Sequence, residues 1–246
     1  MRPVPPNQRP SDREPGCGPK PGVDRAGREE HGRLNLSPLA IAFGIVGLAW
    51  GFAADRLGAR WPAHEDGSVR RLDWRTIVVV GIGGFAMAAL PGRFSEPLHL
   101  AAFGAYGLAL TLLLATDLDQ RLLPDIVTLP MIPLAFLFAL SGQNPLVGGA
   151  LILAIVAAVA IPAVLYIPSL AFGPGAFGLG DVKLLVTVGL VSGAYRALAG
   201  TVAGLFLAGA VIVVLLIARR ITLRSYIPFG PFLIVGAFWA VLMPVG

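Results

Sequence analysis

The sequence predicts an all-α, polytopic integral membrane protein, a helical bundle of about eight transmembrane helices, with seven as the alternative count. Of its 246 residues, 56% are hydrophobic and only 13% are charged, whereas charged residues make up about one quarter of a soluble domain. The apolar runs approach the ~20 residues that a helix needs to cross a ~30 Å hydrocarbon core. They lack the alternation and the length of ~9 to 11 residues that mark membrane barrel strands, so we expect helices.

The chain divides into two regions of different composition. Residues 1–34 contain seven prolines with charged residues between them and no apolar block, which predicts a disordered polar tail. The long charged stretch does not fit a signal peptide either. Residues 35–246 are predicted to form the membrane-embedded domain.

Eight apolar segments are candidate spans. The boundary between the sixth and the seventh is the weakest, because its turn signal is only the short segment SGAYR, residues 192–196. Reading through this segment reduces the count to seven. Two GxxxG pairs, Gly47/Gly51 and Gly200/Gly204, would allow close helix packing, although chance pairs are expected among 31 glycines. The predicted spans are residues 36–54, 76–91, 98–116, 126–141, 146–167, 182–197, 198–218 and 228–245.

The basic residues of the loops predict the orientation, because Lys and Arg near span ends stay on the cytoplasmic side. Ten of them lie in the loops after the first, third, fifth and seventh spans, and only Arg93 and Arg196 lie in the opposite loops. This places the loops after the third and fifth spans in the cytoplasm and requires the eighth span. The tail, with seven basic residues, would then lie outside, which conflicts with the same rule. The ten residues are Arg56, Arg60, Arg70, Arg71, Arg75, Arg121, Lys183, Arg219, Arg220 and Arg224.

Composition argues against several kinds of site. The net charge of +5 does not indicate nucleic-acid binding, because the arginines are scattered through the tail and short loops. Cys17 is the single cysteine, so neither an intrachain disulfide nor an all-cysteine zinc site is expected. The three histidines lie far apart and lack HExxH spacing. We therefore expect no metal and no cofactor.

Two aspartates are the strongest candidates for chemistry. Asp117 directly follows the apolar run 98–116, and Asp181 precedes another apolar run. A charged side chain costs about 2.5 to 3.5 kcal/mol at mid-helix on insertion scales and less near the interface, so it usually has a function there. Two carboxylates brought together from separate helices would share a proton, as in aspartic proteases. One would activate water as general base while the other polarises a scissile carbonyl.

The residues around this pair also have simpler interpretations. Asp125 is expected mainly to cap the fourth span, and Asp181 would serve as a cap of the sixth. The approach to Asp181, residues 172–180, is however denser in glycine than a cap requires, and such a segment lets another backbone come close. Asp119, two residues after Asp117, is expected to point to a different face. A GxGxxG match at residues 173–178 lies between spans and not in a βαβ unit, so we expect no dinucleotide site.

Other classes of function remain as alternatives. A membrane transporter or channel would use the aspartates as a proton relay. It predicts aspartates near the midplane and half-helices in an inverted repeat, whereas both aspartates are predicted at one interface and no repeat is evident. The third alternative is an inactive scaffold of a secretion machine.

The two aspartates lie in the segments TDLDQRLLPD, residues 116–125, and GLGDVKLL, residues 178–185, and a third motif, IPFGPF at residues 227–232, opens the last span. In these motifs the chain shows a resemblance to the prepilin peptidases, or type IV leader peptidases, which are membrane aspartic proteases of the GxGD type. The resemblance covers roughly residues 40–245, including GLAWG at residues 47–51. The resemblance implies a catalytic pair, Asp117 and Asp181. It implies as substrate-binding or supporting residues Gly178, Gly180, Asp119, Asp125 and Lys183.

The resemblance also implies the reaction and its location. An aspartic-type endopeptidase of this kind cuts the short basic leader of a prepilin or pseudopilin after a glycine, at the cytoplasmic side of a prokaryotic inner (plasma) membrane. Membrane lipid is the other expected partner, nucleic acid is not expected, and the oligomeric state is left open. An acidic patch would attract the leader, so binding should be salt-sensitive and weakened by Asp119→Asn. The patch comprises Asp117, Asp119, Asp125 and Asp181.

The chain departs from the family pattern in one respect. Many prepilin peptidases carry paired CxxC motifs that bind zinc after the first span, and they also methylate the new amino terminus. Residues 55–75 contain no cysteine here. The chain therefore resembles a short form that lacks the cysteine zinc loop. Methyltransferase activity is left open, and the catalytic pair is unaffected.

Overall fold

The structure is a computed structural model that describes residues 37–61, 69–172, 177–220 and 229–244. These residues form helices and no strand, which confirms the predicted all-α class. Five of the described helices are long and apolar enough to cross a membrane. The predicted tail and residues 173–176 of the glycine-rich approach lie outside the described residues. The helices are α1 (Pro38–Gly58), α2 (Trp74–Arg93), α3 (Pro97–Gln120), α4 (Asp125–Leu140), α5 (Leu151–Ser169), the short 3-10 helix η2 (Leu170–Phe172), α6 (Leu179–Ile217) and α7 (Gly230–Leu242).

Side-chain caps mark the starts of the first two helices. α1 follows Ser37, whose hydroxyl accepts a hydrogen bond from the Ala40 N–H (3.1 Å). α2 follows Asp73, whose carboxylate accepts one from the Arg75 N–H (3.0 Å). These side chains satisfy backbone donors that the first turn of a helix leaves without partners.

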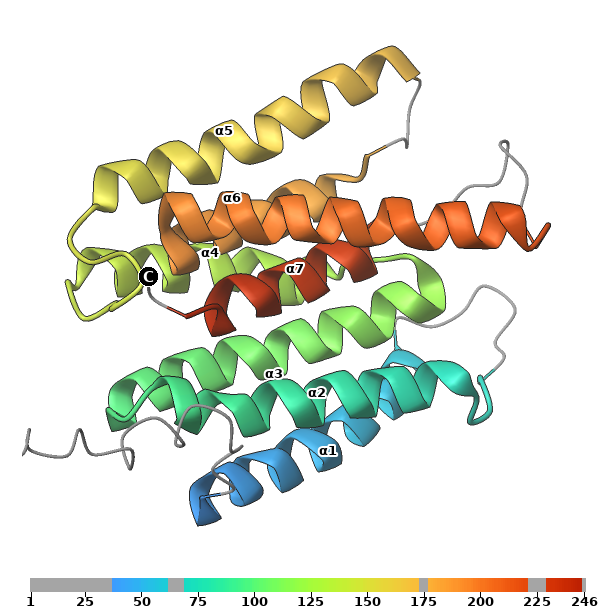
Figure 1. The fold of residues 1–246 in the computed structure, drawn as a ribbon, viewed down its shortest axis with the longest axis horizontal. Helices are drawn as coiled ribbons and strands as arrows, with labels where there is room; N and C mark the ends of the chain where they lie inside the picture. Colours follow the sequence, from blue (N-terminus) through green and yellow to red (C-terminus); the bar gives the residue numbers. More distant parts are fainter. Residues whose placement is uncertain (1–36, 62–68, 173–176, 221–228, 245–246) are drawn as a thin grey trace, which may run out of the picture. The chain divides into compact units, whose positions relative to one another are not determined.

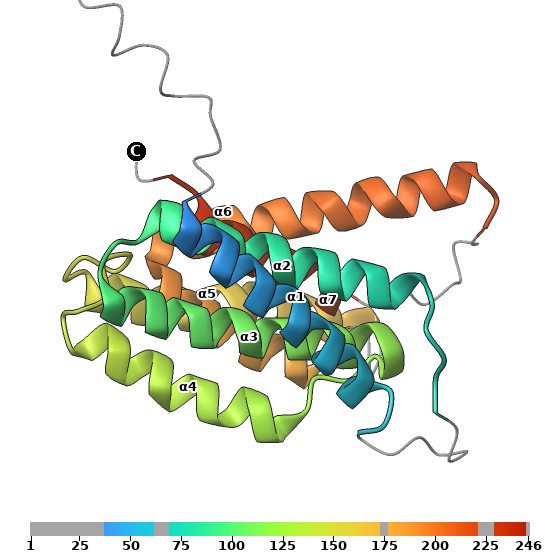
Figure 2. The same ribbon diagram turned by 90° about the horizontal axis from the view of Figure 1, so that it is seen from below.

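The helices run in alternating directions when α6 is counted as the two segments on either side of Gly193, as Figures 1 and 2 show. The C-terminal ends of α1, α3 and α5 therefore lie at the same end of the bundle as the N-terminal ends of α2, α4, α6 and α7. We call this the aspartate end, because Asp117, Asp125 and Asp181 lie there. Arg93 and Arg196 lie at the opposite end. The arrangement of helix ends thus agrees with the alternation of basic residues between loops.

α6 is broken at Gly193, inside the weak turn signal of the sequence. The φ of 72° and ψ of 170° at Gly193 lie outside the helical region, in a range that is essentially restricted to glycine. The chain reverses direction at this residue (Figure 1), so α6 consists of two helical segments. The break separates the sixth and seventh predicted spans and supports the count of eight helical segments.

Some predicted spans have different lengths in the structure. α4 has 16 residues and α7 has 13, fewer than the ~20 that cross a bilayer without help from flanking residues. α5 begins at Leu151 and not at residue 146, because the preceding residues form a turn in which Gly148 and Gly149 have φ values of +56° and +80°. Positive φ values of this kind interrupt a helix.

Two helix pairs approach closely at the glycines of the GxxxG pairs. A side chain at Gly47 of α1 would collide with the backbone oxygen of Gly83 on α2. A side chain at Gly200 of α6 would likewise collide with the backbone oxygen of Gly236 on α7. The close packing that these pairs suggested is therefore confirmed, and it holds α1 against α2 and α6 against α7 beside the buried core of α3.

Candidate active site

The last turn of α3 carries Asp117 in a buried position. Only 4% of Asp117 is exposed. The helix ends at Arg121, which adopts a left-handed conformation (φ 56°, ψ 41°) and donates its N–H to the Asp117 carbonyl (2.9 Å). A left-handed residue other than glycine costs about 1 to 2 kcal/mol. The buried residues Leu123 and Pro124 follow and start α4, so the chain turns sharply away just after Asp117.

Asp181 lies in the first turn of α6. Gly178 is the N-cap residue, and its N–H donates to the Asp181 carboxylate (3.3 Å). The capping interpretation of Asp181 is therefore right in part, since the side chain satisfies a backbone donor at the helix start. The N-terminus of a helix also favours a negative charge at this position.

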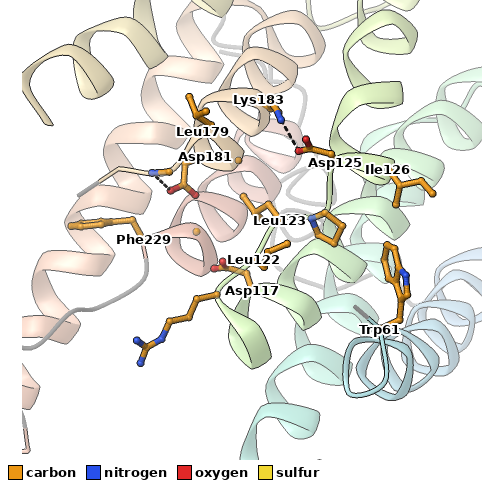
Figure 3. Close-up of a pocket in the computed structure, with 15 residues that line it drawn as sticks. Trp61, Asp117, Leu122, Leu123, Asp125, Ile126, Leu179, Asp181, Lys183 and Phe229 are labelled. Carbon is orange, nitrogen blue, oxygen red and sulfur yellow. Dashed lines mark hydrogen bonds and ion pairs between the residues drawn. The ribbon is translucent and has the colours of Figure 1, made fainter. Parts of the chain in front are cut away.

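Asp117 and Asp181 line one cavity of about 620 Å³ at the aspartate end of the bundle. Figure 3 shows the two carboxyl groups pointing into this cavity from different helices. Of the residues that the sequence suggested for the site, Asp119 does not line the cavity, whereas the other six do. Those six are Asp117, Asp125, Gly178, Gly180, Asp181 and Lys183.

The Asp117 carboxylate is packed against the start of α7. An ideal Cβ added to Gly230 would overlap this carboxylate, at 2.7 Å from its Cγ. The Oδ2 atom of Asp117 is buried and has no hydrogen-bond partner among the described residues. A buried acceptor without a partner costs about 1 to 3 kcal/mol, and such atoms in native proteins often mark a catalytic role or a bound water.

Gly180 holds α6 close to the turn between α3 and α4. A Cβ at Gly180 would lie 2.9 Å from Leu123 Cβ, whereas one at Gly178 would meet Asp181 Oδ2 at an ordinary 3.4 Å. The absence of a side chain at Gly180 thus lets the two aspartate-bearing segments approach each other. The sequence suggested instead that these glycines leave room for the backbone of a substrate.

Asp125 does not cap α4, contrary to the expectation from the sequence. Pro124 occupies the N-cap position, and no side chain makes a capping hydrogen bond there. The Asp125 carboxylate instead pairs with Lys183 Nζ of α6 at 2.5 Å (Figure 3). The side chains of Asp125 and Lys183 are 61% and 25% exposed, so this ion pair lies at the open edge of the cavity.

Asp119 lies on a different face of α3 from Asp117, as expected. Its side chain is only 2% exposed and pairs with Arg70 Nε (2.6 Å) and Arg75 Nη1 (3.1 Å). These contacts give Asp119 a supporting position next to the cavity. The acidic lining of the cavity is therefore narrower than the four-residue patch that the sequence suggested.

Several cavity residues were not recognised from the sequence. They include Gly230, whose contact with Asp117 joins chain segments that are far apart in the sequence. The motif IPFGPF was the only signal that pointed to this segment, and it gave no role to the glycine. The other unrecognised lining residues are Trp61, Arg121, Leu122, Leu123, Pro124, Ile126, Leu179 and Phe229.

A metal site is not evident in the part of the chain that the structure describes. No group of three or more His, Cys, Asp or Glu side chains comes together there in a way that would hold a metal ion. The expectation of a metal-free site remains a prediction, because residues 62–68 of the loop after α1 lie outside the described residues.

Comparison with known proteins identifies the family. Residues 104–223 match the sequence profile of the type IV leader peptidase family. This part of the chain belongs to the type IV leader peptidase family. The match includes both Asp117 and Asp181, which confirms the resemblance noted in the sequence. The matched residues run from α3 into the segment after α6 and carry both cavity aspartates. Gly230 lies after the last matched residue.

Individual leader peptidases are similar over longer or shorter segments. A protein of Burkholderia pseudomallei named "Prepilin leader peptidase/N-methyltransferase" is 34% identical over 181 residues, which is 73% of this chain and 53% of the relative. Relatives of the same name from Pseudomonas aeruginosa and Aeromonas salmonicida are 32% and 35% identical over 127 residues, 51% of this chain and 43% of each relative. The chain thus spans about half the length of these leader peptidases. No solved structure matches it.

Proposed function

We propose that the chain is a membrane-embedded aspartic endopeptidase that removes the leader of prepilin-like or pseudopilin-like proteins. The observation that supports this most is the shared cavity. It receives one carboxyl group from α3 and one from α6, both inside the segment that matches the leader peptidase family. A proton relay across the membrane would need carboxylates near the middle of the bundle, whereas Asp117 and Asp181 lie at helix ends.

The proposed reaction uses the two aspartates as a pair that holds one proton. The ionised carboxylate accepts a proton from a water molecule as the water oxygen attacks the scissile carbonyl. The protonated carboxyl group donates a hydrogen bond to the carbonyl oxygen and stabilises its developing charge. The tetrahedral intermediate collapses when the amide nitrogen receives a proton and leaves as the new amino terminus, and the pair again holds one proton. Burial and a second carboxylate in the same cavity both favour the protonated form of a carboxyl group.

The charges of the cavity suit a basic leader only in part. Three acidic residues, Asp117, Asp125 and Asp181, line it together with Arg121 and Lys183. Asp125 is the exposed acid, and it is paired with Lys183. A lysine- or arginine-rich leader would compete with Lys183 for Asp125 at the rim. The leader attraction therefore depends on Asp125, and the buried Asp119 has no direct part in it.

The proposed cytoplasmic location of the site rests on the loop charges. The aspartate end carries the loops that are rich in Lys and Arg, which favours the cytoplasmic side of a bacterial inner membrane. The proposal concerns peptide cleavage, and it leaves open the methyltransferase activity that appears in the names of the relatives. The substrate protein would bring a hydrophobic helix that follows the cleavage site and remains in the membrane.

A cleavage assay tests this proposal directly. Membranes that contain the protein are mixed with a prepilin whose basic leader ends in glycine, and the loss of the leader is followed as a size shift. Asp117→Asn and Asp181→Asn preserve the shape of the side chains but cannot hold the shared proton, so we expect both to lose cleavage. Glu96→Gln, an exposed carboxylate-to-amide change at the opposite end of the bundle, is the matched control. Cleavage by both aspartate variants at the control rate would refute the mechanism.

A further inference from the structure

A network of charged side chains lies beside the cavity, at the aspartate end of α1, α2 and α3. Asp55, in the last turn of α1, is completely buried. It forms ion pairs with Arg56 and Arg70 and accepts a hydrogen bond from the Thr76 hydroxyl (2.8 Å). A buried carboxylate at this position requires such partners, because an unpaired charge is strongly disfavoured away from water.

Arg70 is the centre of this network. Its guanidinium pairs with Asp55 of α1, with Asp73 at the start of α2 and, through Nε at 2.6 Å, with Asp119 of α3. Burial lowers the pKa of Arg70, but hydrogen bonding and proximity to Asp55, with Asp119 and Asp73 adding to it, raise this pKa above its ordinary value. Only 12% of the side chain is exposed. The Nε atom makes no hydrogen bond to any described residue, so its contact with Asp119 is an ion pair. One planar charged group thus contacts the ends of three helices, which a lysine ammonium would not do as well.

The network holds the turn of α3 that carries Asp117. Asp119 lies two residues after Asp117, so the two side chains leave the helix about 200° apart. Asp119 pairs with Arg70 and accepts a hydrogen bond from Arg75 (3.1 Å), while Asp117 faces the cavity. The same turn is fixed a second time, because Gln120 Nε2 donates to the Gly58 carbonyl (3.2 Å). Gly58 itself lies so close that an added Cβ would be 3.3 Å from the backbone of α3.

Stability alone does not explain a buried ionic network of this kind. Replacing buried ion pairs with well-packed apolar residues is often neutral or stabilising, whereas removing one partner leaves an uncompensated charge. Charged networks are retained in some proteins because they specify one conformation. Here the element that would be specified is the last turn of α3.

We infer that Arg70 is a positioning residue, which holds Asp119 and thereby sets the place of the Asp117 carboxyl group in the cavity. The inference rests on the proposed peptidase function. Arg70 touches neither the cavity nor the reacting groups in this arrangement, so it acts through the backbone of α3. Its loss should lower the turnover of bound substrate more than it weakens substrate binding.

Kinetics of the purified protein with a prepilin substrate test this inference. For Arg70→Gln and Asp119→Asn we expect kcat to fall by roughly 10- to 100-fold, the size of effect that a displacement of about 1 Å has on a catalytic group. KM should change by less than about threefold, because the substrate contacts remain. The matched control is Arg71→Gln, an exposed neighbour in the same segment, which should stay within about threefold of the wild type.

The double variant Arg70→Gln/Asp119→Asn separates positioning from general loss of stability. If both residues act through their contact with each other, the double variant loses little more kcat than either single variant. Arg70→Lys should recover part of the kcat, because it restores the charge but not the planar set of donors. Equal losses from Arg71→Gln, or a kcat for Arg70→Gln and Asp119→Asn within about threefold of the wild type, would overturn the inference.

Hydrogen exchange provides a readout that does not depend on activity. In Arg70→Gln, amides of residues 113–123 should exchange faster than in the wild type, while amides of α5 should not change. If the wild type cuts no prepilin, the proposed function fails, and the exchange experiment still decides whether Arg70 holds this turn. If Arg70→Gln does not fold, Asp119→Asn serves the same comparison. Unchanged exchange of residues 113–123 in a folded variant would refute the positioning role.

Discussion

Replacing Gly230 with alanine would place a methyl group where the Asp117 carboxylate now lies. An ideal Cβ at this position would be 2.7 Å from Asp117 Cγ and closer still to its Oδ2, whereas ordinary contacts begin near 3.4 Å, so one of the two groups must move by at least roughly 0.7 Å. Gly230 is the first residue of α7 and has no positive φ, so alanine is compatible with its backbone. The perturbation therefore acts on the position of Asp117 and not on the ability of α7 to form.

The expected effect is large for catalysis and moderate for stability. A displacement approaching 1 Å at a catalytic group costs on the order of 100-fold in rate, which is about 2.7 kcal/mol of transition-state stabilisation. Overpacking by one methyl group typically costs about 1 to 3 kcal/mol of unfolding free energy. The higher helix propensity of alanine offsets up to about 1 kcal/mol of this loss.

A graded series of glycine-to-alanine variants provides the assay. Gly81→Ala adds a methyl group into open space, Gly178→Ala adds one at an ordinary 3.4 Å from Asp181, and Gly230→Ala adds one onto Asp117. Cleavage rates with a prepilin substrate should follow this order, with Gly81→Ala equal to the wild type and Gly230→Ala lowest. Thermal unfolding of each variant shows whether it is folded. A folded Gly230→Ala variant that cuts at the rate of Gly81→Ala would refute the reasoning.

Two further predictions concern the rim of the cavity and the opposite end of the bundle. Lys183→Gln releases Asp125 from its ion pair, so we expect the KM of this variant for a basic leader to be lower than that of the wild type at low salt. The difference between the two KM values should vanish near 1 M salt, where the screening length is about 3 Å. A KM for the variant above that of the wild type at low salt would contradict this. Arg196→Met removes the hydrogen bond from Arg196 to the Met243 carbonyl (2.5 Å), which should lower the unfolding free energy by about 1.5 to 3 kcal/mol. Since Arg196 is far from the cavity, kcat of the folded fraction should not change, and a loss of kcat would show coupling between the two ends.

The two aspartates and the break in α6 were predictable because each involves a residue type that is unusual within or beside an apolar membrane segment. Asp117 and Asp181 stand out as charges beside apolar runs, and Gly193 stands out as the turn signal in a long apolar region. The composition of the spans likewise determines the all-α class, because the backbone in a bilayer must satisfy its own hydrogen bonds.

The remaining features depend on contacts between segments that are distant in the sequence. The local pattern around Asp125 suggested a helix cap, but Pro124 takes that position and Asp125 pairs with Lys183 of another helix. Arg70 was recognised only as a loop charge, although it joins three helix ends. The sequence around Gly230 likewise does not indicate its contact with Asp117, because this contact depends on how α7 packs against α3.

The reversal at Gly193 determines whether the chain crosses the membrane an even or an odd number of times. A helix that ran straight through all 39 residues of α6 would be about 58 Å long, nearly twice the ~30 Å thickness of the hydrocarbon core. It would also deliver the first residue of α7 to the face of the membrane opposite Asp117. Because α6 turns back, the chain makes one more crossing and Gly230 returns to the carboxylate that it covers. A variant in which residues 186–217 formed one straight helix would retain every motif residue and still separate the third motif from the first by the width of the bilayer.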